Sequence, residues 1–120
     1  MPPADAPPAP AGRSLRARLA PGRAAFNRGE FFAAHELWED VWRDLTGSDR
    51  TFVQGLIQIA AGLHHVQHGR PRPGARVIAR GVAKLEASTT LLPTAALLRD
   101  VRRLLATLER IPNRPATSAS

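Results

Sequence analysis

The segment from Phe52 to His68 constrains the fold more than any other part of the chain. At 3.6 residues per turn, its apolar side chains form one broad face, made of Phe52, Leu56, Ile59, Leu63 and Val66 and widened by Val53, Ile57 and Ala60. A helix with so broad an apolar face is expected at the centre of the fold, with neighbours on several sides. Gly55 and Gly62 are seven residues apart and share a side. Glycine in a helix interior costs about 1 kcal/mol relative to alanine, so this pair predicts close approach of another helix.

Four further segments carry helix signals, and none shows the alternation of apolar and polar residues that predicts a strand. Gly29 and Gly69 follow periodic segments and are expected to end the first and third helices. Ser48 or Asp49 is expected to cap the third helix, and Pro21 to interrupt or restart the first. The expected helices cover about residues 15–27, 30–45, 48–68, 73–88 and 94–110.

The two ends of the chain have few side chains that could form a core. Residues 1–12 form a Pro/Ala-rich leader and residues 112–120 a tail with two prolines, and both are expected to be disordered. Residues 13–111 are expected to form a single helical domain, because short connections favour antiparallel neighbours. The predicted fold class is all-α: a compact array of about five helices with the second and third as a central antiparallel pair.

Composition excludes several kinds of site. The 120 residues include no cysteine, which removes disulfides, thiolate metal ligands and cysteine nucleophiles. No apolar stretch reaches the length of a membrane span, and the first ten residues lack the charged and apolar regions of a signal peptide. We therefore expect a cytoplasmic protein without a membrane partner.

The formal net charge of +7 raises the question of a polyanionic partner. Arg72, Arg76, Arg80 and Lys84 form a basic stripe at four-residue spacing, which is the candidate surface for nucleic acid. No known nucleic-acid-binding motif and no neighbouring aromatic residue accompanies this stripe. A solvated helix face is therefore the alternative interpretation.

The second expected helix concentrates side chains that can carry chemistry. Phe32, His35 and Glu39 lie along one edge of its apolar stripe, and His35 and Glu39, four residues apart, are expected to meet there. They form either a structural contact or a catalytic pair, in which Glu36 or Glu39 assists. A zincin motif would require a second histidine where Glu39 stands, so the sequence argues against a metalloprotease.

Histidines of the third expected helix extend this candidate site. His64 borders the apolar face, and His64 and His68 have the four-residue spacing at which two imidazoles can bind one metal ion. If the two helices pack antiparallel, His35, Glu39 and His64 provide two nitrogens and a carboxylate, the ligand count of a catalytic zinc site. We expect His35 to be mostly buried and hydrogen-bonded outside its own helical turn, with His64 lining the same cavity.

The order of these residues resembles a known family, domain of unknown function 309, which comprises small helical proteins of bacteria and archaea. The family pattern joins FN-x-G-x-[FY]-[FY]-x-x-H-E-x-x-E-x-x-W to a G-L-I-Q helix that ends near a histidine. The positions that match are Phe26, Asn27, Gly29, Phe31, Phe32, His35, Glu36, Glu39, Trp42, Gly55, Leu56, Ile57, Gln58 and His64. The resemblance covers roughly residues 22–86 and implies an all-helical fold. Members have carried the label of predicted metal-dependent hydrolase.

Three functions remain open at this point. The first is a helical protein of unknown biochemical role, with a homodimer as its candidate assembly and a polar pocket lined by Phe32, Trp42, Gln58 and His64 beside His35 and Glu39. The second is a hydrolase that uses a divalent metal such as zinc, held by His35, Glu39 and His64. The third is a basic helical module that binds nucleic acid through Arg72, Arg76, Arg80 and Lys84.

Overall fold

The computed structural model describes residues 11–88 and 92–112, which contain five α-helices and no strand. The helices are α1 (Ala11–Asn27), α2 (Phe31–Trp42), α3 (Gly47–Gln67), α4 (Pro71–Ala87) and α5 (Ala95–Glu109). The all-α fold class is therefore confirmed. None of these helices is long and apolar enough to span a membrane.

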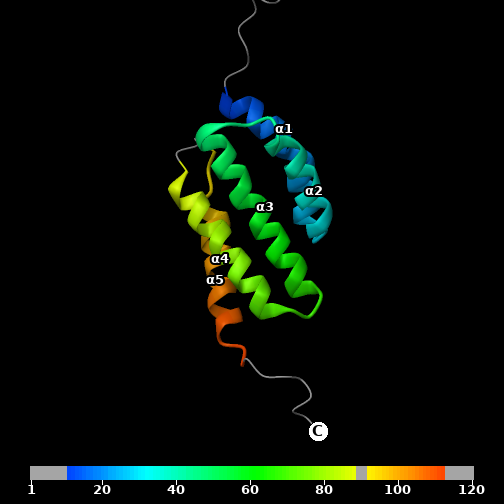
Figure 1. The fold of residues 1–120 in the computed structure, drawn as a ribbon, viewed down its shortest axis with the longest axis vertical. Helices are drawn as coiled ribbons and strands as arrows, with labels where there is room; N and C mark the ends of the chain where they lie inside the picture. The colour runs from blue at the N-terminus through cyan, green and yellow to red at the C-terminus, as the bar shows by residue number, and fades with distance from the viewer. Residues whose placement is uncertain (1–10, 89–91, 113–120) are drawn as a thin grey trace, which may run out of the picture.

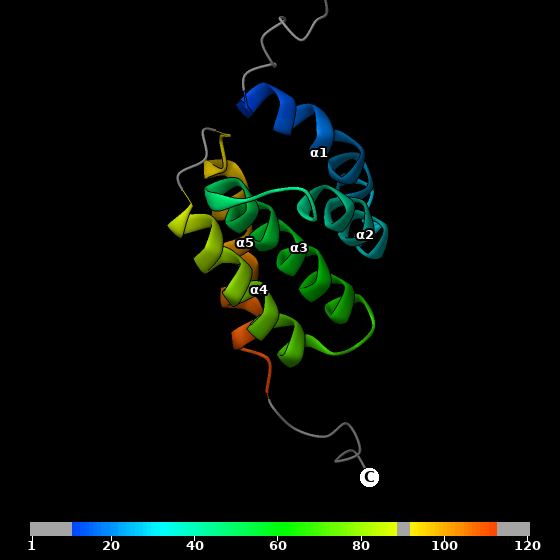
Figure 2. The same cartoon turned by 45° about the horizontal axis from the view of Figure 1, so that its top comes forward.

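Helix α3 lies in the middle of the array, with α2 on one side and α4 on the other (Figures 1 and 2). Helix α1 packs on α2, and α5 packs on α4, so each helix contacts mainly its neighbour in sequence. The expected central role of α3 follows from its apolar circumference, and Val53, Ile59 and Ala60 are fully buried.

Glycines set the distance between α3 and α4. A Cβ atom built on Gly55 would lie 2.8 Å from the carbonyl oxygen of Gly81, and one on Gly62 would lie 2.7 Å from that of Gly74. The converse contacts, from Gly81 and Gly74 to the oxygens of Gly55 and Gly62, are 2.6 Å each. The predicted close approach is confirmed, and the partner helix contributes two matching glycines.

A tryptophan fixes α1 against α2. The Trp38 indole is buried, and its Nε1 donates a hydrogen bond of 3.1 Å to the Leu19 carbonyl oxygen. Gly22 makes room for it, because a Cβ there would lie 2.3 Å from Nε1. Phe26 completes this contact with its ring centroid 5.6 Å from that of Trp38.

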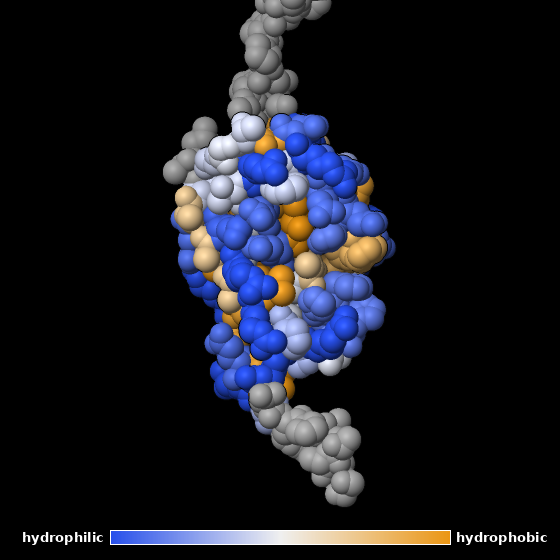
Figure 3. All heavy atoms as spheres, viewed as in Figure 1, coloured by the Kyte–Doolittle hydropathy of each residue, from blue (hydrophilic) through white to orange (hydrophobic). Residues whose placement is uncertain are grey.

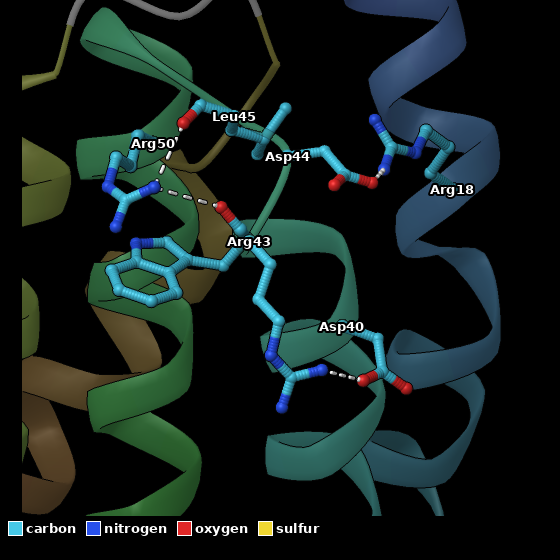
Figure 4. A network of polar contacts seen from close by, with 7 residues as sticks. Arg18, Asp40, Arg43, Asp44, Leu45 and Arg50 are labelled. Atoms are coloured by element: carbon cyan, nitrogen blue, oxygen red, sulfur yellow. Dashed lines mark hydrogen bonds and ion pairs between the residues drawn. The ribbon is translucent and has the colours of Figure 1, made fainter.

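The short connection between α2 and α3 is held from both sides (Figure 4). The Arg50 guanidinium lies 3.7 Å from the Trp42 ring centroid and donates to the Leu45 carbonyl oxygen at 3.1 Å. On the other side, Arg18 of α1 pairs with Asp44 at 3.2 Å. Arg50 thus satisfies a carbonyl group just after the end of α2 that has no partner within that helix.

Both expected glycine stops are confirmed. Gly29 and Gly69 have φ of +80° and +77°, and each is followed by a residue whose N–H bonds five residues back, Glu30 to Ala25 and Arg70 to His65, both at 2.9 Å. This pattern is the Schellman motif, in which a left-handed residue ends the helix.

Other boundaries differ from the predictions. Helix α1 begins at Ala11, within the expected leader, and continues through Pro21 without interruption. Helix α2 ends at Trp42 rather than Leu45: the N–H groups of Asp44 and Leu45 bond three residues back in a turn, and Arg50 donates to the Trp42 carbonyl oxygen. Thr46, not Ser48 or Asp49, precedes α3, and the Ser48 hydroxyl instead lies 3.2 Å from that of Ser88. The remainder of the two segments expected to be disordered, residues 1–10 and 113–120, lies outside the described residues.

Candidate functional site

The antiparallel packing of α2 and α3 brings the predicted histidines together around one phenylalanine. The ring centroids of Phe32 and His35 are 5.9 Å apart with the planes nearly parallel, and those of Phe32 and His64 are 5.3 Å apart. Phe32 therefore contacts both imidazoles, and it is 52% exposed. His64 also contacts the His68 ring, at 4.2 Å between centroids.

His35 lacks the hydrogen bond that was predicted from the sequence. Its side chain is half-buried rather than mostly buried, and its Nδ1 is buried without a partner among the described residues. Neither Glu36 nor Glu39, both within the described part of α2, supplies that partner. Packing against Phe32, rather than a carboxylate, holds the imidazole, so the structure does not form the proposed His35–Glu39 pair.

Burial is the main cause that lowers the pKa of His64 below its ordinary value. The charges of His68, His65, Arg70 and His35, in that order, lower the pKa further, because each disfavours a second positive charge nearby. His64 is therefore kept in its neutral form to a lower pH than a free histidine.

The other two residues predicted to line the polar pocket are half-buried and incompletely hydrogen-bonded. Trp42 Nε1 and Gln58 Oε1 have no hydrogen-bond partner in the described part of the chain, and the same holds for His65 Nδ1. Such groups lose hydration without regaining a hydrogen bond, which destabilises the folded state.

The predicted three-ligand metal site is not assembled. Within residues 11–88 and 92–112, no group of three or more histidine, aspartate or glutamate side chains is arranged so that it could hold a metal ion. His35 and His64 each pack against the Phe32 ring. His35, Glu39 and His64 therefore do not form the expected ligand set.

A different region forms a cavity that is partly open to solvent. Its volume is about 560 Å³, and it lies where α1 and α5 diverge over one face of α3. The apolar lining side chains are Leu19, Phe26, Phe31, Trp38, Phe52, Leu56, Ile59, Leu63, Leu92, Pro93, Leu97, Val101 and Leu104. None of the residues predicted for the polar pocket belongs to this set.

The polar residues of this cavity carry a net positive charge. Arg16 and Arg23 come from α1, both exposed, and neither forms an ion pair with another described residue. The one acidic residue of the lining, Asp100, lies 3.7 Å from Arg99, so its charge is partly compensated. The cavity is thus an apolar volume with two free guanidinium groups among its lining residues.

The cavity follows from how the helices pair. Helix α1 is held to α2 by Trp38, and α5 is held to α4, so neither lies flat on the Phe52–Leu63 face of α3. The apolar pattern of α3 places this face in the core, and no signal within that helix reveals the gap. Two sequence signals could have predicted this cavity. They are the apolar positions of α1 and α5, such as Leu19 and Val101, and the arginines beside the apolar positions of α1.

Comparisons with known proteins agree with the fold. Residues 19–77 match the family described as "Domain of unknown function (DUF309)". The crystal structure of a conserved hypothetical protein of Thermus thermophilus, TTHA0068, is similar with a TM-score of 0.63 and 32% identity, over 72% of this chain and 94% of that one.

An uncharacterized protein of Aquifex aeolicus is 38% identical over 55 residues, which are 45% of this chain. The matched segment spans only 16% of the Aquifex protein, so that protein is much longer than the shared region.

Proposed function

Because the chain belongs to the DUF309 family, whose description names no activity, we propose a function from the cavity itself: binding of a fatty-acid-type amphiphile, a linear acyl chain ending in a carboxylate. The observation that carries the proposal is the combination of a 560 Å³ apolar volume with two guanidinium groups that have no ion pair among the described residues.

Size and lining support an acyl chain. Ligand pockets are typically about 300–1,000 Å³, mostly apolar, with a few polar groups that orient the ligand. The cavity falls within this range, and 13 of its 18 lining residues are apolar. Of the five polar ones, Thr94 is half-buried, and Arg16, Arg23, Asn27 and Asp100 are exposed. Burial of each methylene contributes about 0.8 kcal/mol, so a chain of several methylenes supplies most of the expected affinity.

The two arginines support an anionic head group. Carboxylates bind guanidinium through paired N–H donors, and this charge-assisted geometry favours arginine over lysine. Arg16 and Arg23 are seven residues apart on α1 and therefore point to the same side of that helix. The head group would remain near solvent, because both side chains are exposed.

The test measures binding of dodecanoate and of dodecanol to the full chain by calorimetry. The double variant Arg16→Gln/Arg23→Gln is expected to weaken dodecanoate binding about tenfold, the effect of roughly 1.4 kcal/mol, and to leave dodecanol binding unchanged. Arg43→Gln is the matched control, since Arg43 is exposed on the surface and pairs with Asp40 away from the cavity.

Two outcomes would contradict the proposal. One is the absence of saturable dodecanoate binding to the wild-type chain. The other is an equal loss for the acid and the alcohol in the double variant, which would place the effect on folding rather than on the carboxylate.

A further inference from the structure

The positive charge of this protein is concentrated in its C-terminal half. Residues 70–110, which hold α4 and α5, contain nine basic and three acidic residues, a net charge of +6 out of the total of +7. The rest of the chain has eight basic and seven acidic residues, and its charges nearly cancel. This division is a property of the fold as well as of the sequence, because α4 and α5 pack on each other on one side of α3.

Most of the basic groups in this half are not neutralised within the protein. Arg99 pairs with Asp100, and Arg102 pairs with Glu86. The basic residues of α4 and α5 that form no ion pair in the described part of the chain are Arg70, Arg72, Arg76, Arg80, Lys84, Arg103 and Arg110. In the α1–α2 half, three arginines are paired, Arg18, Arg28 and Arg43, while Arg16 and Arg23 form no ion pair with another described residue.

Three of the free arginines form a row on α4. Arg72, Arg76 and Arg80 are spaced by four residues, about 6 Å of helix rise per step. Arg76 and Arg80 are exposed, and Figure 3 shows hydrophilic residues over α4 with apolar ones among them. Arg72 and Arg76 also line a shallow depression of about 270 Å³ between α4 and α5, next to Ala75, Ala79, Leu108 and the acidic Glu109.

We propose that the outer surface of α4 and α5, centred on Arg72, Arg76 and Arg80, binds the phosphate backbone of double-stranded nucleic acid without reading its sequence. Unpaired guanidinium groups in a row bind phosphate oxygens and release the counterions condensed on the duplex. The proposal does not depend on the acyl-chain cavity, which lies on the α1–α5 side and uses Arg16 and Arg23.

The absence of aromatic residues from α4 and α5 favours a duplex over a single strand. All six aromatic side chains of the protein fall between Phe26 and Phe52, whereas single-strand binding relies on bases stacking on aromatic rings. A duplex keeps its bases stacked internally and presents phosphates alone, which is what arginines without aromatic neighbours can bind.

The burial pattern of the same helices favours nucleic acid over a membrane surface. Amphipathic helices that bind a membrane insert an apolar face between the lipids. In α4 and α5 the apolar residues Ile78, Val82, Leu85, Val101 and Leu108 are already buried within the protein. Val77, Leu97, Leu98, Leu104 and Leu105 are half-buried, and no large apolar residue of α4 or α5 is fully exposed, so the outer face offers charge with little apolar surface to insert.

The test follows the fluorescence anisotropy of a labelled DNA duplex with increasing salt. The variant Arg72→Gln/Arg76→Gln/Arg80→Gln is compared with the control Arg18→Gln/Arg28→Gln/Arg43→Gln. The control also removes three positive charges, but from the α1–α2 half. We expect the α4 variant to bind at least tenfold more weakly and to lower the slope of log K against log salt by about 2–3, as for loss of three phosphate contacts. The control is expected to retain the wild-type slope.

Several results would overturn the proposal. These are the absence of duplex binding at low salt, equal losses in both triple variants, tighter binding to an oligothymidylate than to the duplex, or binding to anionic vesicles but not to the duplex. Because Arg72 is half-buried, the double variant Arg76→Gln/Arg80→Gln, which changes only exposed residues, gives the same test if the triple variant does not fold.

Discussion

Individual residues of the α2–α3 contact affect the stability of the fold, either because a buried polar group lacks a hydrogen bond or because a side chain changes its charge. Gln58 Oε1 and Trp42 Nε1 are buried without partners among the described residues, and the neutral form of His64 is favoured by its surroundings. None of these features requires a ligand, and each has a consequence that a stability measurement can detect.

Replacing Gln58 by methionine is expected to stabilise the protein. The side chains are similar in size, and the change removes a buried acceptor whose lost hydration costs the folded state about 1–3 kcal/mol. We expect the free energy of unfolding in urea to rise by up to about 1 kcal/mol. Gln54→Met, one turn earlier on the same stripe, has no such buried acceptor to remove and should change stability little. A clear loss in Gln58→Met would show that the Gln58 amide forms a bond in solution.

The lowered pKa of His64 predicts a loss of stability toward acid. A histidine has a pKa of about 6.5 in the unfolded chain, and His64 has a lower one in the folded chain. Between these values the unfolded state binds more protons, so the contribution of His64 is complete above about pH 6.5 and is lost as the pH falls toward its folded pKa.

His64→Gln should therefore show a smaller decrease in Tm between about pH 7 and 5 than the wild-type chain, at the ionic strength of a dilute buffer. Phe32→Ala should also reduce the decrease, because it removes a ring that packs against the imidazole and so hydrates His64. An unchanged pH dependence in both variants would mean that other groups cause the acid sensitivity.

Among the helices, the α3–α4 contact is the one that tolerates least change. Four glycines place the two backbones in contact at Gly55–Gly81 and Gly62–Gly74, without side chains between them. A larger residue at any of the four would meet a carbonyl oxygen, and a backbone group cannot rotate away as a side chain can.

The sign of the stability change in Gly62→Ala distinguishes packing from helix propensity. Propensity alone predicts a gain of about 1 kcal/mol. The clash with the Gly74 carbonyl oxygen at 2.7 Å and with Ile78 Cγ1 at 2.5 Å predicts instead a loss of about 1–3 kcal/mol. Ala61→Gly, at the adjacent position, should lose only the propensity difference of about 1 kcal/mol. Stabilisation by Gly62→Ala in urea unfolding would refute the close contact.

At the scale of the whole molecule, the two halves differ in what they expose. The α1–α2 pair has nearly balanced charge and one wall of the apolar cavity with Arg16 and Arg23, while α4, α5 and their flanking residues hold most of the other described basic residues without an ion pair. The two proposed binding surfaces therefore lie mainly on different helices, the cavity on α1 and α3 and the basic surface on α4. Helix α5 contributes residues to both.

A larger side chain that fills the cavity should abolish ligand binding without lowering the stability of the protein. Leu104→Trp adds a large side chain to the α5 wall, where apolar contacts are incomplete, so the Tm should be equal to or higher than that of the wild-type chain. Dodecanoate binding should be lost, and duplex binding through α4 should be unaffected. A variant that still binds dodecanoate with wild-type affinity would place the acyl chain outside the cavity.

The sequence by itself determined the helical class, the central position of α3, its close glycine contact and the two glycine stops. These features depend on local periodicity and on the conformational freedom of single residues, which neighbours in space change little. The tertiary structure decided the rest. It packed both His35 and His64 against the ring of Phe32, so that the histidines meet an aromatic ring instead of a carboxylate. It also left a pocket between α1 and α5 beside the Phe52–Leu63 face of α3, because α1 and α5 are each held to another helix. Such features depend on the angles at which helices pack, and residue spacing along one helix does not specify those angles.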